Sequence, residues 1–490
     1  MGKSQAYIHL KPSTLPPVFA PWNRKALNHR TPTVGVNTKT APSPLILRVP
    51  LLKFPSVIGH STSRINRLIN EDTYSVNILK LPTRFQELSR NHEPLLKKSI
   101  LNISIFDGHG GKGRVSQLLA SSLHREITNT EAPTKEQFFH LLDSYEQLIG
   151  GPYWRNVNAH RETFWDRFIE NCNTKQEQVL FDSDHPQHSG PRMIFDMYGN
   201  IIDKTSLLNF HERLRIYYAY MKFDLERCCG FAQESGESLT FEERIKKYSG
   251  GSTASSIFLS SYDESLAMDE SFFMNPQGLL KLVVTQVGDS KIILCDQNGI
   301  AHSLTKIHHP SSRRESKRLQ ADDDVEGKKE QDDDANQDSF GETRFLNNFA
   351  NTRSFGDLLG KRDGISCEPD IYSYLIGDTS LLPHAEKSKL QFGGEECFIC
   401  LISDGVSDLL SDQEVVDLIT STVNLRQTKQ ATPQYVAEEV IKYIQAIGGK
   451  HADNATCLVL RLPNWGNWPM IDRTGAIREE KLMNSTSSLD

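Results

Sequence analysis

The stretch LNISIFDGHGGKGRVSQLLASSLHREI, residues 101–127, decides the fold because its hydrophobic period changes in the middle. An apolar run that predicts a buried strand ends in Asp107, and the glycines that follow allow a tight turn. The next apolar residues recur at helical spacing, and they are Val115, Leu118, Leu119, Leu123 and Ile127. The stretch therefore predicts a strand, a turn and a helix, with a carboxylate held at the end of the strand.

The stretch ECFICLISDGVSDLLSDQEVV, residues 396–416, repeats this design further along the chain. Asp404 follows an apolar run that predicts another buried strand. Ser411 and Glu414 have the spacing of a capping box, which predicts that a helix begins at this point.

Two other stretches also place carboxylates beside predicted strands. Asp453 comes just before an apolar run, and Glu71 and Asp72 precede a strand expected around residues 74–79. An Asp-Gly turn alone is common, but several carboxylates at strand ends indicate a shared site. Clustered carboxylates cannot all stay ionised unless cations compensate them. Because oxygen ligands select hard cations, the pattern favours Mg²⁺ or Mn²⁺ over zinc.

The glycine-rich turn GHGGKG, residues 108–113, does not match the known phosphate-binding loops. It lacks the early glycine of a phosphate loop, and no Ser or Thr follows Lys112. The glycine spacing of a dinucleotide fingerprint is displaced by one position. An enzyme that binds nucleotides through this turn is therefore the weaker hypothesis.

Composition limits the class of protein. The 490 residues are 38% hydrophobic and 24% charged, as in globular chains, and the net charge of −7 argues against a nucleic-acid partner. No run of about 18 apolar residues occurs, so we expect no transmembrane segment. Cys397 and Cys400 have zinc-like spacing without a second pair, and we expect them to pack as small hydrophobic side chains.

The apolar runs at residues 280–287 and 291–295 are separated by the turn GDS, which favours a hairpin. Asn298-Gly299 predicts a further hairpin, and residues 211–228 have the spacing of a helix. Strand runs mixed with a few strong helices, without regular alternation, predict an α+β fold in layers.

The motifs, taken in order, resemble those of the metal-dependent protein phosphatases of type 2C. They are RLINED, FDGHGG, GGSTA, VGDSKIIL, NTRSFGD, EPDI, SDGVSD and ADNAT. The resemblance covers residues 57–462, and it implies a four-layer αββα sandwich in which two antiparallel β-sheets are flanked by helices. It also implies one catalytic domain with insertions at about 128–249 and 321–338, followed by a polar C-terminal tail at 463–490.

The resemblance implies a set of metal ligands. Asp107 would bridge two ions, either Mg²⁺ or Mn²⁺, and the carbonyl of Gly108 would ligate one of them. Asp404 and Asp453 would hold the other ion. Asp408 matches a ligand of a third, weaker site, but Tyr248 stands where the family often has an aspartate. A third ion is therefore doubtful.

The resemblance also implies catalytic roles. Arg67 would grip the phosphate with its guanidinium, and His109 would give a proton to the leaving oxygen. Glu71, together with Asp72, would act through metal-bound water. Two cations would lower the pKa of a bridging water, and the resulting hydroxide would attack phosphorus in line.

The implied activity is that of a metal-dependent protein serine/threonine phosphatase, a monomer acting on phosphorylated protein substrates. The alternative is a catalytically weak protein that uses the phosphatase fold to bind a partner. The presence of Asp107, Asp404 and Asp453 argues against this alternative, because decayed members usually lose metal ligands.

The start of the chain indicates where the protein is located. Residues 1–70 contain ten Lys and Arg and no Asp or Glu, which is typical of an organelle transit peptide. A disordered basic arm is the alternative, and eight prolines in residues 1–50 favour it. We expect residues 1–56 to be a transit peptide of a mitochondrial, fungal-type member, in the matrix or intermembrane space, with cytoplasm or nucleus as the alternative.

Overall fold

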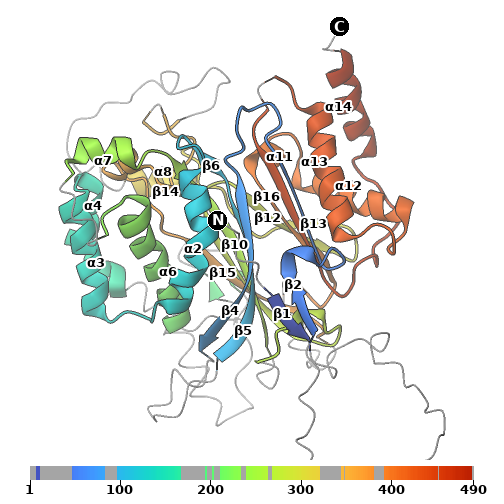
Figure 1. The fold of residues 1–490 in the computed structure, drawn as a ribbon, viewed down its shortest axis with the longest axis horizontal. Coiled ribbons are helices and arrows are strands. Elements are labelled where there is room, and N and C mark those ends of the chain that lie inside the picture. The colour runs from blue at the N-terminus through green and yellow to red at the C-terminus, as the bar shows by residue number, and fades with distance from the viewer. Residues whose placement is uncertain are drawn as a thin grey trace, which may run out of the picture.

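Two five-stranded antiparallel sheets lie face to face at the centre of the computed structural model (Figure 1). The structure describes residues 7–10, 47–82, 97–166, 194–195, 201–202, 210–232, 239–262, 268–320, 344–346, 348–379, 391–450 and 452–487. The acidic insertion predicted at 321–338 lies outside these residues.

The first sheet has the strand order β15-β11-β10-β5-β4, and every neighbouring pair in it is antiparallel. Its strands are β4 (Thr73–Pro82), β5 (Lys97–Phe106), β10 (Ala254–Ser261), β11 (Leu279–Val287) and β15 (Asp370–Gly377). The second sheet has the order β13-β12-β16-β17-β3. Its strands are β3 (Ile58–Ser63), β12 (Lys291–Asp296), β13 (Ala301–Ser303), β16 (Glu396–Ile402) and β17 (Ala455–Arg461).

Side chains of β16 show how the layers form. Ile399 and Leu401 point into the core between the two sheets. Phe398, Cys400 and Ile402 face the opposite way, into a core beneath the helices of the second sheet. Because successive side chains of a strand alternate in direction, a run that is apolar throughout is buried on both faces. The prediction that Cys400 packs as a small hydrophobic side chain is confirmed.

Helices cover the outer face of each sheet (Figure 1). The first sheet is covered by helices α2 (Arg114–Asn129), α3 (Lys135–Leu148), α4 (Pro152–Ala159), α6 (Phe210–Phe223) and α7 (Phe241–Lys247), with the π-helix η5 (Asp224–Cys228) continuing α6. The second sheet is covered by α12 (Asp412–Arg426), α13 (Pro433–Ile447) and α14 (Gly475–Ser487). The predicted α+β fold with four αββα layers is confirmed.

Shorter elements complete the description. The helical ones are η3 (Leu51–Lys53), η7 (Phe272–Met274), α8 (Arg313–Gln320), α9 (Leu358–Lys361) and α11 (Asp404–Ser407). The short strands are β1 (Tyr7–Leu10), β2 (Leu47–Pro50), β6 (Gly108–His109), β7 (Ile194–Phe195), β8 (Ile201–Ile202), β9 (Gly251–Ser252) and β14 (Phe355–Gly356).

The local predictions for helices are confirmed, and one predicted hairpin is wrong. Ser411 and Glu414 form the capping box that begins α12. The strands β11 and β12, on either side of the GDS turn, lie in different sheets rather than pairing. Both edges of β11 already pair, with β10 and with β15, so no edge is left for β12. The hairpin at Asn298-Gly299 does form, between β12 and β13.

The described part of the basic N-terminal segment packs on the sandwich. Strands β1 and β2 form an antiparallel ribbon. Ile8, Leu10 and Leu51 are buried in the core between the two sheets. Residues 1–6 and 11–46 lie outside the described part of the chain, so a transit peptide over 1–56 stays a prediction. Its removal would take three buried side chains from this core.

The predicted insertion and tail both contribute packed helices. Phe138, Tyr145 and Trp154 of the 128–249 stretch are buried against the helices of the first sheet. Beyond residue 463, Trp465 and Trp468 lie edge-on to the ring of Phe398. None of the helices in the described ranges is long and apolar enough to cross a membrane.

Candidate functional site

The acidic residues at the strand ends converge on one site. Asp107 follows β5, Asp289 follows β11 and Asp404 follows β16, so strands of both sheets contribute. One carboxylate oxygen from each of these three residues lies within 4.8 Å of the other two. The sequence predicted Asp107 and Asp404 but missed Asp289, although Asp289 stands in the quoted VGDSKIIL motif. Its signal was the same as theirs, an aspartate at the end of an apolar strand.

The cluster is short of positive charge. Burial raises the pKa of Asp107 well above its usual range, and the charges of Asp404 and Asp72 raise it further. Burial and the charge of Asp289 likewise raise the pKa of Asp404. Oδ2 of Asp107 and Oδ1 of Asp289 are buried with no hydrogen-bond partner among the described residues. An oxygen-only cluster with unpartnered atoms fits a hard divalent cation.

Of the two neighbouring acids Glu71 and Asp72, Asp72 lies close enough to the cluster for its charge to act on Asp107. Oδ2 of Asp72 accepts hydrogen bonds from Ser403 Oγ at 2.9 Å and from Thr456 Oγ1 at 2.7 Å, while its buried Oδ1 has no partner among the described residues. Burial raises the pKa of Asp72 to about 6. Glu71 instead accepts from the backbone N–H of Gly113 at 2.8 Å, at the start of α2.

The loop that carries Arg67 is tied to the segment that carries Asp453. Arg67 Nη2 lies 2.6 Å from Asp453 Oδ2, and both side chains are about half exposed, at 53% and 41%. Asn454 Nδ2 donates to the carbonyls of Arg64 and Ile69, and its Oδ1 accepts from the Glu71 N–H. The asparagine of the ADNAT motif therefore holds the arginine loop beside the cluster.

His109 is paired with a second residue that the sequence did not single out. Its Nε2 lies 2.8 Å from Oδ2 of Asp357, the last residue of the NTRSFGD motif. Burial alone would lower the pKa of His109, but the charge of Asp357 raises it to about 9. Asp357 has the unusual φ of 47°, a conformation that non-glycine residues keep only when their surroundings enforce it.

A small sheet brings His109 and Asp357 together. Its strand order is β14-β9-β6, so β9, which begins at the second glycine of the GGSTA motif, lies between the other two. A Cβ on Gly251 would lie 2.2 Å from Asp357 Oδ2, which leaves no room for any side chain there. Glycine at this position lets the carboxylate reach across β9 to the imidazole.

Comparison with known proteins points to the same family as the motifs. Residues 229–453 match the family model described as protein phosphatase 2C. Protein phosphatase 2C homolog 4 of Schizosaccharomyces pombe is 26% identical over 437 residues, covering 89% of this chain and 88% of that protein. The resemblance to protein phosphatase 2C is confirmed.

Other similar proteins match over less of the chain or at lower identity. The mitochondrial protein phosphatase 1K of Xenopus laevis is 27% identical over 187 residues, which cover 38% of this chain and 41% of that protein. A solved structure of serine-threonine phosphatase 2C from Toxoplasma gondii has a TM-score of 0.43 and 15% identity, over 83% of this chain and 94% of that one.

Two further residues that the protein phosphatase 2C resemblance points to, Gly108 and Asp408, lie beside the cluster. A Cβ on Gly108 would lie 2.6 Å from the Glu71 carbonyl oxygen, so only glycine fits there. Asp408 is exposed, and its charge is among those that raise the pKa of Asp404. The ring of Tyr248, at the position of the missing third-site aspartate, lies 5.2 Å from the guanidinium of Arg114.

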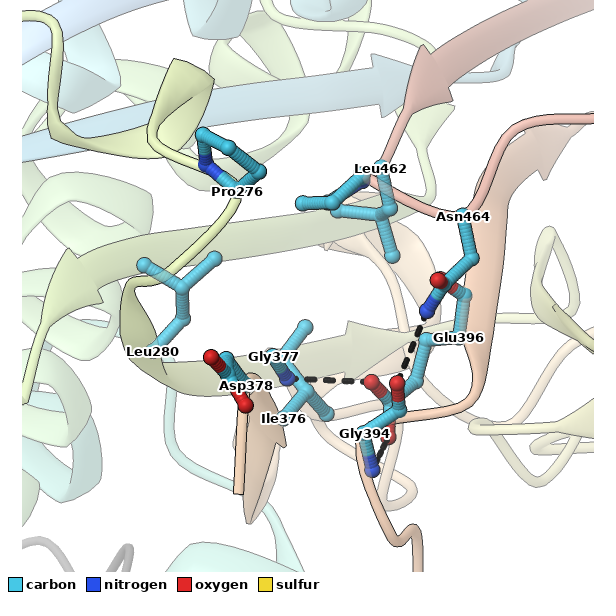
Figure 2. A pocket seen from close by; sticks show the side chains of 10 residues that line it. Pro276, Leu280, Ile376, Gly377, Asp378, Gly394, Glu396, Leu462 and Asn464 are labelled. Atoms are coloured by element: carbon cyan, nitrogen blue, oxygen red, sulfur yellow. Dashed lines mark hydrogen bonds between the residues drawn. The ribbon is translucent and has the colours of Figure 1, made fainter. Parts of the chain in front are cut away.

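A pocket lies at the opposite end of the strands (Figure 2). It is bordered by Leu280 at the start of β11, whereas Asp289 follows the end of this nine-residue strand, about 30 Å away at the usual rise per residue. One of its two carboxylates, Glu396, accepts from the N–H groups of Gly377 at 3.0 Å and Gly394 at 3.1 Å. Both oxygens of Glu396 accept hydrogen bonds from the backbone, whereas the aspartate cluster has oxygens without a partner among the described residues.

Proposed function

We propose that this protein is a metal-dependent protein serine/threonine phosphatase. The observation that carries the proposal is the group formed by Asp107, Asp289 and Asp404, whose oxygens lie within 4.8 Å of one another. The relatives named protein phosphatase 2C support hydrolysis of phosphorylated proteins. Three carboxylates at this spacing cannot all stay ionised unless cations compensate them, and phosphoryl transfer is a reaction in which such cations are useful.

We propose that the residues of this site hold two divalent cations, either Mg²⁺ or Mn²⁺. Asp107, Asp404 and Asp453 would hold them, with the Gly108 carbonyl and with Asp289 as an additional acidic neighbour. Asp72 has a second oxygen with no partner among the described residues, and this oxygen would act with Glu71 through metal-bound water. Bound cations would supply activation of water and compensation of the phosphoryl charge. The calorimetric titration described below tests whether Asp408 helps to hold a third ion.

The chain's own side chains would bind the phosphoryl group and move a proton. Arg67 is half exposed beside Asp453, so its guanidinium can clasp two phosphoryl oxygens when substrate arrives. His109 would give its proton to the oxygen of the leaving serine or threonine. Asp357 would hold the imidazole with Nε2 in a fixed direction, at 2.8 Å. Glu71, whose carboxylate accepts from the Gly113 N–H, would act through metal-bound water.

The test is phosphate release from a phosphothreonine peptide by the full chain, with and without Mn²⁺ or Mg²⁺. We expect turnover that rises with the cation, saturates, and disappears on chelation. Asp107→Asn is the matched control, because it keeps the shape of the side chain and removes its charge. A folded protein that releases no phosphate with either cation would overturn the proposal. A calorimetric titration of Mn²⁺ would count the bound ions.

A mitochondrial location is a second part of the proposal. The basic, acid-free start of the chain supports it, as does one relative that is named mitochondrial. A reporter fused to residues 1–56 should enter mitochondria, and a diffuse signal would contradict this. N-terminal sequencing of the protein from the organelle would show whether Ile8 and Leu51, which are buried in the core, are kept.

A further inference from the structure

A buried ion pair lies behind the segment that carries Asp357. Lys361 Nζ is 2.9 Å from Asp224 Oδ2, and both side chains have no exposed surface. Asp224 is the first residue of the π-helix η5, within the long 128–249 stretch, and Lys361 is the last residue of α9. Two charges removed from water in this way cost free energy, so the pair needs a reason other than stability alone.

The two charged groups each bind one backbone atom at β14, one before Phe355 and one after it. Lys361 Nζ donates to the carbonyl of Ser354 at 2.7 Å. The N–H of Gly356 donates to Asp224 Oδ1 at 2.7 Å. Ser354 and Gly356, on either side of Phe355, are therefore held by hydrogen bonds. Apolar side chains could not replace these bonds, because a hydrogen bond fixes the direction of the donor and acceptor, whereas apolar contact does not.

The same segment leads directly to His109. Ser354 Oγ donates to Asp357 Oδ2, the oxygen that also pairs with His109 Nε2. The N–H of Asp357 donates to the carbonyl of Gly250, beside β9. Hydrogen bonds on the carbonyl and the hydroxyl of Ser354 thus connect the ion pair to Asp357 and the imidazole.

Helices of the 128–249 stretch hold the ion pair in place. Tyr145 OH of α3 donates to the carbonyl of Met221 at 2.8 Å and lies 3.3 Å from Asp224 Oδ2. Trp154 Nε1 of α4 donates to the carbonyl of Lys361 at 2.8 Å. A Cβ on Gly151 would lie 2.2 Å from the carbonyl oxygen of Arg362, so this stretch approaches the segment closely.

We propose that Asp224 and Lys361 are positioning residues for proton donation by His109. They hold β14, β14 holds Asp357, and Asp357 fixes the direction of the imidazole. The long stretch at 128–249 would then act on catalysis through Asp224 rather than only through contacts with substrate. This inference rests on the proposed phosphatase function.

The test compares two substrates with different leaving groups. A serine or threonine oxygen must receive a proton when it leaves, whereas p-nitrophenolate leaves without one. For Lys361→Met with Mn²⁺, we expect kcat on a phosphothreonine peptide to fall at least about tenfold more than kcat on p-nitrophenyl phosphate. A merely structural loss would lower both to the same extent.

A second variant guards against failure to fold. Asp224→Asn/Lys361→Met removes both charges, so neither is left buried without a partner, while the Ser354 carbonyl still loses its donor. The matched control is Lys281→Met, which removes a lysine that is also buried and bonded to the carboxylate of Glu212 on α6. We expect the control to leave the ratio of the two kcat values unchanged.

A measurement without turnover separates this inference from the proposed function. In protein with ¹⁵N-labelled histidine, the His109 ring N–H should give one downfield signal, assigned by its loss in His109→Gln. We expect that signal to broaden or move upfield in both Lys361→Met variants and to persist in Lys281→Met. An unchanged signal together with an unchanged kcat ratio would overturn the positioning role. An inactive wild type with the signal change would overturn only the phosphatase proposal.

Discussion

The two ends of β5 and β11 hold carboxylates in opposite electrostatic surroundings. At their beginnings, Lys98 and Lys281 lie 2.8 Å and 2.7 Å from the two oxygens of Glu212. At their other ends, one carboxylate oxygen each of Asp107, Asp289 and Asp404 lies within 4.8 Å of the other two. The first cluster contains its own compensating charges, and the second contains only negative ones.

The difference separates a structural cluster from a functional one. Burial would raise the pKa of Glu212, but the charges of Lys281 and Lys98 hold it well below its usual range. For Asp107, burial and neighbouring carboxylates act in the same direction and raise the pKa. A carboxylate group that the protein leaves uncompensated indicates that something from outside the chain completes it.

Removing Glu212 should have the largest effect on stability. Glu212→Gln leaves Lys98 and Lys281 buried without their counter-charge, and we expect a loss of about 3–5 kcal/mol in the free energy of unfolding. Urea unfolding measures it. Asp289→Asn is the matched change at the other end of the strands, and it should stabilise the metal-free protein by about 1 kcal/mol because it removes repulsion. Equal effects at the two ends would abolish the distinction between them.

Removing a carboxylate from the aspartate cluster should have its main effect on activity. We expect Asp404→Asn to lower turnover of a phosphothreonine peptide at least about a hundredfold, since loss of outer-shell partners alone costs ten- to a hundredfold at metal sites. Excess Mn²⁺ should restore part of the rate. Full activity in this variant would show that the cluster is not the catalytic site.

Metal binding should stabilise only the aspartate end. With free Mn²⁺ at a hundred times its Kd, we expect about 2.7 kcal/mol of added stability, seen as a rise in Tm. The rise should persist in Lys281→Met and shrink in Asp404→Asn. A rise of the same size in both variants would mean that the ion binds elsewhere.

The effect of Glu212 should depend on pH. Its pKa is lower in the folded than in the unfolded protein, so the unfolded state binds more protons and stability rises with pH. The contribution is therefore complete above the unfolded pKa, about 4.3, and is lost as the pH falls below it. The difference in unfolding free energy between wild type and Glu212→Gln should shrink between pH 7 and pH 3. A constant difference would exclude ionised Glu212 as its source.

The smallest effect on stability should come from Arg67. Its ion pair with Asp453 is about half exposed, and such pairs contribute less than about 1 kcal/mol. Arg67→Ala should instead raise KM for the phosphopeptide with little change in Tm, because the guanidinium binds the phosphoryl group. An unchanged KM would contradict this role.

Sequence reasoning worked where a local period controlled the structure. The apolar spacing of Val115, Leu119 and Leu123 predicted α2. All three are buried in the core between the first sheet and the helices that cover it. It was wrong about the hairpin at the GDS turn, because the edges of β11 are taken by strands distant in sequence. No local pattern contains that information.

The site shows the same division. Asp107 and Asp404 were found because each ends an apolar strand, and the motif order carried the resemblance to protein phosphatase 2C. The position of Asp72 beside the cluster was decided by Ser403 and Thr456, which bond it from the other sheet. The partner of His109 was decided by the small sheet that brings Asp357 across β9.

The sequence by itself determined the layers, the strand-end aspartates and the family resemblance, since these follow from short-range periods and motif order. Only the tertiary structure decided that Asp289 joins the cluster, that Asp357 pairs with His109, and that Asp224 and Lys361 lie behind them. The physical reason is that charge compensation depends on distances between residues far apart in the chain, which the packing of two sheets and their helices sets.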